Sequence, residues 1–227
     1  MTQKTLAVLH TSFVFINVEP VFQDLFEENL PGLHIIDFVD SDVLAAVNRE
    51  GKINESHVQR MTHLAKAAEA SGADLIFSAC SSLGPTIDTA RKMVNVPIVK
   101  IDDAMTQKAV ELGSRIGVMA TVPTTLRPTI DLLQEKAKAA GKTLETQPYL
   151  CEGAFDVLMS GDRNRHDQMV LAGAQELAPN VDLIVLAQAS MSRLAPMLSQ
   201  EVGKEVLSSP RLAVQYVKNL LFQPQDV

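Results

Sequence analysis

An internal repetition constrains the fold of this chain more than any other feature of its sequence. Four strand-like segments of the first half recur in the same order about 110 residues later. The matched pairs are Leu6–Thr11 with Ile116–Thr121, the strand near His34 with the one near Leu144, Asp74–Ser82 with Asp182–Ser190, and Ile98–Asp103 with Glu205–Pro210. One such match could arise by chance, but four at nearly one offset indicate a duplicated structural unit.

Each repeat alternates short apolar runs with stretches of helical period, which is typical of α/β units built on a parallel sheet. The 227 residues suffice for two halves of ordinary domain size. We predict a first half over residues 1–102, with 208–227 packing back on it, and a second half over 103–207. The predicted strands are Thr5–Leu9, Leu33–Phe38, Leu75–Ala79, Ile98–Ile101, Ile116–Met119, Thr143–Tyr149, Leu183–Ala187 and Glu205–Leu207.

Composition and charge exclude several classes of function. The net charge is −7 and the basic residues are scattered, so the stripe typical of nucleic-acid binding is missing. The apolar runs are short, whereas a membrane helix needs about 20 such residues. A polar N-terminal stretch and two cysteines without zinc spacing predict a cytoplasmic protein with reduced thiols. The sequence leaves open whether the chain forms a homo-oligomer.

The loops that follow the predicted strands are the first candidates for a site, because ligands of open parallel sheets bind beyond the carboxyl ends of the strands. Two facing halves would enclose a cleft lined by four such loops. Their small hydroxyl side chains and backbone N–H groups favour an anion such as a carboxylate. The candidate substrate-binding residues are His10, Thr11, Ser12, Ser81, Ser82, Thr121, Thr124, Thr125 and Ser190. For any single hydroxyl residue, a helix cap is the simpler interpretation.

Cys80 is the candidate catalytic residue. It directly follows an apolar strand and opens a Ser-Ser-Leu-Gly-Pro turn. A thiol at the start of a helix has a lowered pKa, and its thiolate can remove a proton from carbon or attack a carbonyl. The competing interpretation is a buried cysteine that packs as a small apolar side chain. Cys151 has no hydroxyl loop around it and is interpreted as inert.

Three segments in order carry a resemblance to a known family. The turn at Cys80-Ser-Ser, the stretch Leu186-Ala-Gln-Ala-Ser-Met and the stretch Gly117-Val-Met-Ala-Thr resemble the aspartate/glutamate/hydantoin racemases. The resemblance covers nearly the whole chain, duplication included. It implies two pseudo-symmetric α/β halves with the active site between them and no metal or organic cofactor. It also implies two cysteines that exchange the α-proton of a small carboxylate substrate on opposite faces.

One position departs from the pattern of that family. The second family cysteine should stand six residues after Asp182, as Cys80 stands six after Asp74, and this chain has Gln188 there. A carboxamide does not exchange protons near neutral pH, but it donates hydrogen bonds to an oxyanion or a carboxylate. We therefore expect one-sided chemistry with Cys80 as acid, base or nucleophile, either an isomerisation or a decarboxylation of the lyase type.

A rival hypothesis comes from another class of protein. A ligand-binding or regulatory protein could keep the cleft and lose the two-thiol chemistry, and Gln188 is its best support. A dinucleotide-dependent enzyme is disfavoured because no Gly-x-Gly-x-x-Gly follows a predicted strand. The acidic cluster Asp37, Asp40 and Asp42 suggests a metal ion or, more simply, a helix cap.

Overall fold

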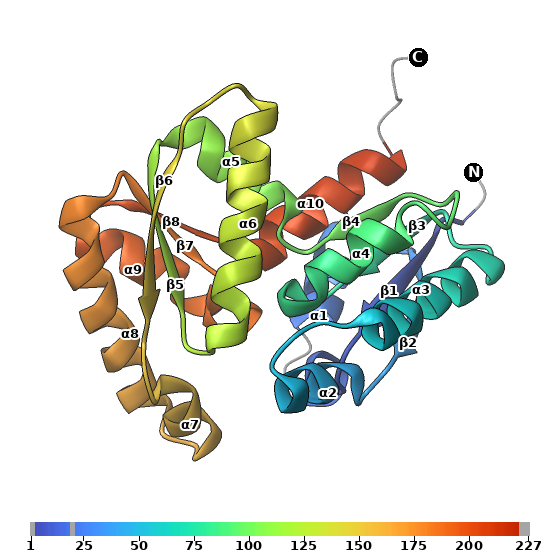
Figure 1. Ribbon diagram of the computed structural model, residues 1–227, viewed down its shortest axis with the longest axis horizontal. Coiled ribbons are helices and arrows are strands. Elements are labelled where there is room, and N and C mark those ends of the chain that lie inside the picture. Colours follow the sequence, from blue (N-terminus) through green and yellow to red (C-terminus); the bar gives the residue numbers. More distant parts are fainter. Residues whose placement is uncertain (1–2, 19–20, 223–227) are drawn as a thin grey trace. The chain divides into compact units, whose positions relative to one another are not determined.

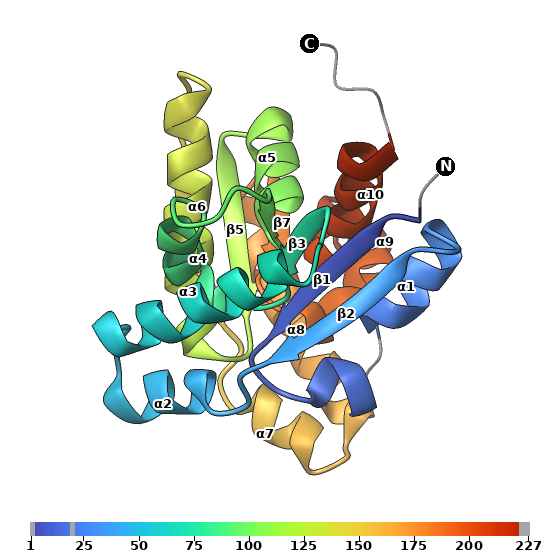
Figure 2. The same cartoon turned by 90° about the vertical axis from the view of Figure 1, so that its right-hand side faces the viewer.

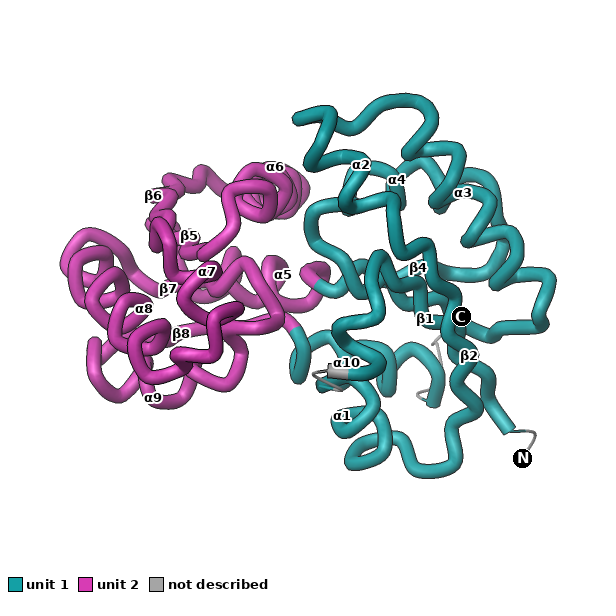
Figure 3. The backbone as a smooth tube through the Cα atoms, turned by 90° about the horizontal axis from the view of Figure 1, so that it is seen from below, with its two compact units in different colours: residues 1–101, 210–227 teal, residues 102–209 magenta. Residues whose placement is uncertain are grey.

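The computed structural model describes residues 3–18 and 21–222, which divide into two compact units (Figures 1 and 3). Unit 1 lies within residues 1–101 and 210–227, and unit 2 comprises residues 102–209. The sequence-based expectation placed these boundaries at 102/103 and 207/208. None of the helices in the described part of the chain has the length and hydropathy that crossing a membrane requires.

Unit 1 is built around four parallel strands in the order β2-β1-β3-β4. Figure 2 shows β1 and β2 side by side. Its elements are β1 (Thr5–His10), η1 (Val14–Val18), α1 (Val21–Asn29), β2 (His34–Val39), α2 (Val43–Glu50), α3 (Glu55–Ala70), β3 (Leu75–Ser78), η2 (Ser81–Leu83), α4 (Gly84–Ala90), β4 (Ile98–Lys100) and, except for its first residue, α10 (Ser209–Phe222).

Unit 2 repeats this topology with parallel strands in the order β6-β5-β7-β8. Its elements are α5 (Asp103–Leu112), β5 (Arg115–Ala120), α6 (Pro123–Ala139), β6 (Glu145–Leu150), α7 (Ala154–Met159), α8 (Arg163–Leu177), η3 (Ala178–Asn180), β7 (Leu183–Leu186), η4 (Ala189–Leu194), α9 (Ala195–Val202) and β8 (Glu205–Ser208). The predicted α/β class with two parallel sheets is confirmed. Each predicted strand overlaps an observed one, and the ends differ by at most two residues.

Helices cover both faces of the sheet in unit 1, because the buried strands present apolar side chains on both sides. On one face, Ala7 and Leu9 of β1 pack with apolar residues of α2, α3 and α4. On the other face, Phe22 and Phe26 of α1 make edge-to-face contacts with Phe77 of β3, at centroid distances of 5.3 and 5.8 Å. This second face is the one that carries the pocket described below.

Unit 2 buries its largest core cluster between α8, α9 and the central strands. Leu177, at the end of α8, packs against β5 at Gly117. A Cβ built at Gly117 would lie 2.5 Å from Leu177 Cδ2 and 2.8 Å from its Cγ. The matching position of the first repeat is Ala7, in β1. The glycine is therefore explained by the close approach of one helix and not by the strand itself.

A duplicated carboxylate joins the starts of the two central strands in each unit. In unit 1, Asp74 accepts hydrogen bonds from Lys4 Nζ at 2.7 Å and from the backbone N–H of Thr5 at 2.8 Å. In unit 2, Asp182 accepts from the backbone N–H groups of Ser114 and Arg115, at 3.0 and 2.9 Å, and from the Arg115 guanidinium. These donors lower the pKa of both carboxyls, so both are ionised at neutral pH.

We expect Gly117→Ala to destabilise unit 2 by about 1–3 kcal/mol, because the added methyl overpacks against Leu177. The measurement is urea unfolding followed by circular dichroism. Gly84→Ala is the matched control, since a Cβ there meets nothing closer than Lys100 Cδ at 3.7 Å. Equal stability of the two variants would contradict the proposed clash. Adding Leu177→Ala should remove the extra cost of the methyl group.

Candidate active site

The loops that carry the unit 1 candidates begin side by side. Strands β1 and β3 are paired, with Leu9 opposite Ser78, and the Ala79 N–H donates to the Leu9 carbonyl at 3.1 Å. The chain therefore leaves the sheet next to His10 on one strand and next to Cys80 on the other. This places the two predicted segments of the first repeat at one edge of one sheet, as the strand pattern requires.

Cys80 occupies the position before η2, in an extended conformation with φ −130° and ψ 112°. Its side chain is half-buried, and it packs against the core cluster on the α3/α4 face. Helix α4 follows η2 directly. Cys151 is more deeply buried: it is 5% exposed, and burial raises the pKa of its thiol to about 11. Of the two cysteines, Cys80 is the more accessible.

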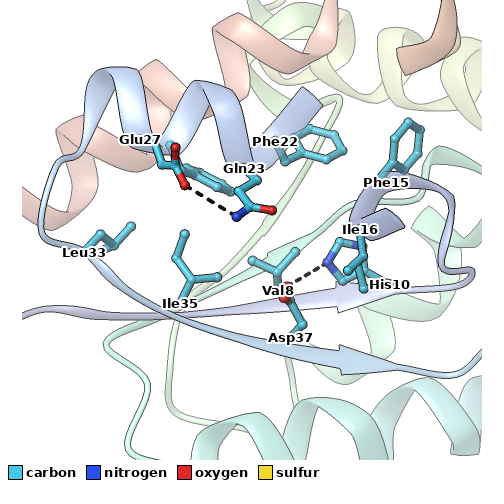
Figure 4. A pocket seen from close by; sticks show the side chains of 11 residues that line it. Val8, His10, Phe15, Ile16, Phe22, Gln23, Glu27, Leu33, Ile35 and Asp37 are labelled. Atoms are coloured by element: carbon cyan, nitrogen blue, oxygen red, sulfur yellow. Dashed lines mark hydrogen bonds and ion pairs between the residues drawn. The ribbon is translucent and has the colours of Figure 1, made fainter. Parts of the chain in front are cut away.

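His10 ends β1 and turns towards the α1 face of the sheet. Its side chain is 3% exposed, and its Nε2 lies 2.9 Å from Oδ1 of Asp37 on β2 (Figure 4). A carboxylate only accepts hydrogen bonds, so Nε2 carries the proton. The other ring nitrogen, Nδ1, is buried without a hydrogen-bond partner among the described residues. Asp37 thus orients His10, while Asp40 accepts from the Val43 N–H at the start of α2.

Gln188 follows β7 and closes the corresponding edge of unit 2. Its Oε1 accepts three hydrogen bonds, from the Thr121 N–H at 2.6 Å, the Val122 N–H at 2.9 Å and the Thr121 hydroxyl at 3.1 Å. These donors fix the orientation of the amide, because Nε2 could not accept from them. We call them the Thr121 cradle. The Nε2 group of Gln188 donates to none of the described residues, so its two N–H bonds are available to a ligand.

The hydroxyl candidates fall into two groups. Three are used within the protein: Ser12 accepts from the Val14 N–H, Thr121 donates to Gln188, and Thr125 donates to the Val122 carbonyl. The remaining hydroxyls make no hydrogen bond with the described residues; these belong to Thr11, Ser81, Ser82, Thr124 and Ser190. The second group is therefore the better supported as a lining for an anion. The structure describes the unit 1 and unit 2 sets on separate units.

Two residues of this region were missed as functional candidates. Lys100 ends β4 next to the Cys80 edge, is almost fully buried, and pairs with Asp88 of α4 at 2.8 Å. It stands beside Ser78 in the strand register. A charged residue inside the otherwise apolar predicted strand Ile98–Ile101 was the available signal. Asp37 was interpreted as a cap or metal ligand, because its partner His10 is 27 residues away in the sequence. Among the described residues, no group of three or more His, Cys, Asp or Glu could hold a metal ion.

The comparison with protein families decides the identity of this fold. The model of the Asp/Glu/hydantoin racemase family matches residues 22–217. The chain belongs to this family. None of the curated protein sequences matches it significantly.

Solved structures of racemases share the fold of this family member. A glutamate racemase from Bacillus anthracis superposes with a TM-score of 0.74 at 15% identity, over 97% of this chain and 82% of the other. A glutamate racemase from Francisella tularensis, in complex with D-glutamate, gives 0.71 at 16% identity over 98% and 82%. An allantoin racemase from Klebsiella pneumoniae gives 0.67 at 18% identity over 96% and 88%.

The Thr121 cradle predicts how this racemase-family chain responds to substitution of Gln188. We expect Gln188→Ala to lower the free energy of unfolding by about 1–3 kcal/mol, because three hydrogen-bond donors lose their acceptor. Gln188→Glu keeps an oxygen in the cradle and should stay within about 0.5 kcal/mol of the unsubstituted chain. Urea unfolding of both variants measures the difference. If Gln188→Ala is as stable as Gln188→Glu, the cradle contributes nothing to folding.

Burial predicts different reactivities for the two cysteines. With a pKa of about 11, roughly one Cys151 thiol in a thousand is ionised at pH 8. We expect iodoacetamide to label half-buried Cys80 at least tenfold faster than Cys151, whose rate should climb until the pH approaches 11. Peptide mass spectrometry over a pH series follows both sites in one sample. Faster labelling of Cys151 would contradict the assignment.

Proposed function

We propose that this chain is a cofactor-independent enzyme of the racemase family, an isomerase or a related lyase, that acts on a small carboxylate. Cys80 is its acid/base or nucleophile, and Gln188 is a hydrogen-bond donor to the same substrate molecule. The proposal places the enzyme in the cytoplasm, where the thiol stays reduced. Family membership supports racemase-type chemistry in general, and the residues below support its one-sided form.

The observation that carries the proposal is the state of the Gln188 carboxamide. Its oxygen is fully engaged in the Thr121 cradle, and its two N–H bonds are unused. A residue held this way cannot remove a proton from carbon, but it donates to an oxygen in a fixed direction. Fixed donors of this kind stabilise negative charge that develops on a carboxylate during reaction.

The chemistry then runs through a single thiol. The Cys80 thiolate takes the α-proton, and the electron pair of the C–H bond moves into the carboxylate, which becomes an enediolate. The Cys80 thiol exchanges this proton with solvent and returns a proton to carbon, which restores the carboxylate. Gln188 N–H groups stabilise the new charge on oxygen. In the lyase variant, loss of carbon dioxide generates the enediolate, and the Cys80 thiol supplies a proton to carbon. Either route uses one acid/base, which typically contributes 10²–10⁴-fold to the rate.

A small carboxylate is the proposed substrate because the unused groups are hydrogen-bond donors. Thr11, Ser81 and Ser82 follow the strands of unit 1, and Thr124 and Ser190 follow those of unit 2. A similar fold binds D-glutamate in the Francisella protein. Small dicarboxylates are accordingly the first compounds to test.

One observation favours a second function. The absence of a thiol at position 188 fits a binding protein that kept its ligand and lost the reaction. Such a protein would bind carboxylates without exchanging their α-protons. The two functions are therefore separated by one pair of measurements, binding and exchange, on the same compounds.

We expect the chain to exchange the α-proton of at least one small carboxylate for deuterium in D₂O, followed by proton NMR. The test set is both enantiomers of aspartate and glutamate together with 2-substituted malonates. Cys80→Ser should lower the rate at least a hundredfold with ligand binding retained, whereas the control Cys151→Ser should keep it. Unchanged exchange in Cys80→Ser would overturn the role of the thiol. Binding without exchange in the unsubstituted chain would favour the binding protein.

A further inference from the structure

Unit 1 contains a pocket that shares His10 with the candidate substrate-binding residues but is lined by neither Cys80 nor its hydroxyl loop. It has a volume of about 280 Å³ and opens between α1, η1 and the first two strands (Figure 4). Its lining residues are Val8, His10, Phe15, Ile16, Phe22, Gln23, Phe26, Glu27, Leu33, Ile35 and Asp37. Seven of these residues are apolar and four are polar, so the pocket suits a small ligand that combines a hydrocarbon body with a polar head group.

Several polar atoms of this pocket are hydrogen-bond acceptors without a partner among the described residues. His10 Nε2 lies 2.9 Å from Asp37 Oδ1, and Nδ1, which is an acceptor when Nε2 carries the only ring proton, is buried without a partner. Oδ2 of Asp37 accepts from no described residue. Gln23 Nε2 donates to Glu27 Oε1 at 3.4 Å, and the side-chain oxygen of Gln23 accepts from none of the described residues. A ligand that matches these acceptors must bring hydrogen-bond donors.

The charge of the pocket has one sign. Asp37 and Glu27 are the charged residues among the described lining, and no lysine or arginine is among them. Asp37 has a side chain 44% exposed, so a ligand reaches it without breaking its bond to His10. Negative charge beside apolar walls favours a cation with an apolar portion.

We propose that this pocket binds a small organic ammonium ion. Its ammonium group would donate to His10 Nδ1 and the carboxylate of Asp37, Glu27 would add a second negative charge to the lining, and its apolar body would contact Phe15, Phe22 and Ile35. The buried acceptor on His10 is the observation that separates this site from an ordinary surface hollow, because a buried polar atom without a partner is costly. The inference does not rest on the proposed function, since Cys80 and Gln188 take no part in it.

The test uses one ligand shape with three different head groups. 2-Phenylethylammonium, 2-phenylethanol and 3-phenylpropanoate are titrated into the full chain at pH 7.5 by calorimetry. We expect the ammonium ion to bind at least fivefold tighter than the alcohol, and the carboxylate to bind weakest. Equal binding of all three, or no binding of the ammonium ion, overturns the proposal. Repeating the titration with Cys80→Ser keeps this result separate from catalysis.

Substitutions then locate the site. Asp37→Asn keeps an acceptor for His10 and removes the charge, and we expect it to weaken ammonium binding at least threefold. Glu27 lies on the exposed side of α1, so Glu27→Gln provides a second variant that does not disturb the core. Asp24→Asn is the matched control, an exposed acid on the same helix outside the pocket. Equal weakening by all three variants would show a general charge effect and would overturn the assignment.

Discussion

The architecture depends on one interaction that occurs twice, the carboxylate that joins the starts of the central strands in each unit. Asp74 and Asp182 each follow a helix and enter a central strand, where they accept backbone N–H groups that begin the neighbouring strand. Their lowered pKa values reflect these donors. By fixing the register at the amino ends of the strands, they determine which residues emerge together at the carboxyl ends. That register brings Cys80 and the His10 loop to one edge of the first sheet. It likewise brings Gln188 and the Thr121 loop to one edge of the second sheet.

The sequence was sufficient for the scaffold because the scaffold rests on local patterns and on their repetition. Apolar runs such as Leu183–Leu186 directly predict buried strands, and the offset between the repeats gives each strand its counterpart in the other unit. The side-chain partners were not predictable in this way. Gln188 accepts from residues that lie 66 and 67 positions away in the sequence, and His10 lies 27 positions from its partner Asp37. Such contacts depend on strand order, which no composition or spacing encodes.

The two units show how one scaffold diverges at matched positions. Where the first repeat has Cys80, the second has Gln188, and this change alters the chemistry of the strand end. Where the first has Ala7, the second has Gly117, and this change admits Leu177 against the strand. The first difference was visible in the sequence, because it replaces a thiol by a carboxamide at a matched strand end. The second is explained only by the observed approach of Leu177 to the strand.

The Gln188 carboxamide also explains why the anion-binding hypothesis needs revision in one respect. A loop rich in backbone N–H groups was expected to hold the substrate directly, yet in unit 2 the Thr121 cradle already holds an oxygen of the protein. The oxygen of the Gln188 amide accepts from the three donors of the cradle. The nitrogen of the same amide then offers two other N–H donors, further from the backbone. An oxygen of the substrate would meet a neutral amide group and not the backbone itself. A thiol at this position could neither fill the cradle as an acceptor of this strength nor present N–H groups, so the residue that stands where the repeat would place a second cysteine is the same one that completes the strand end of unit 2.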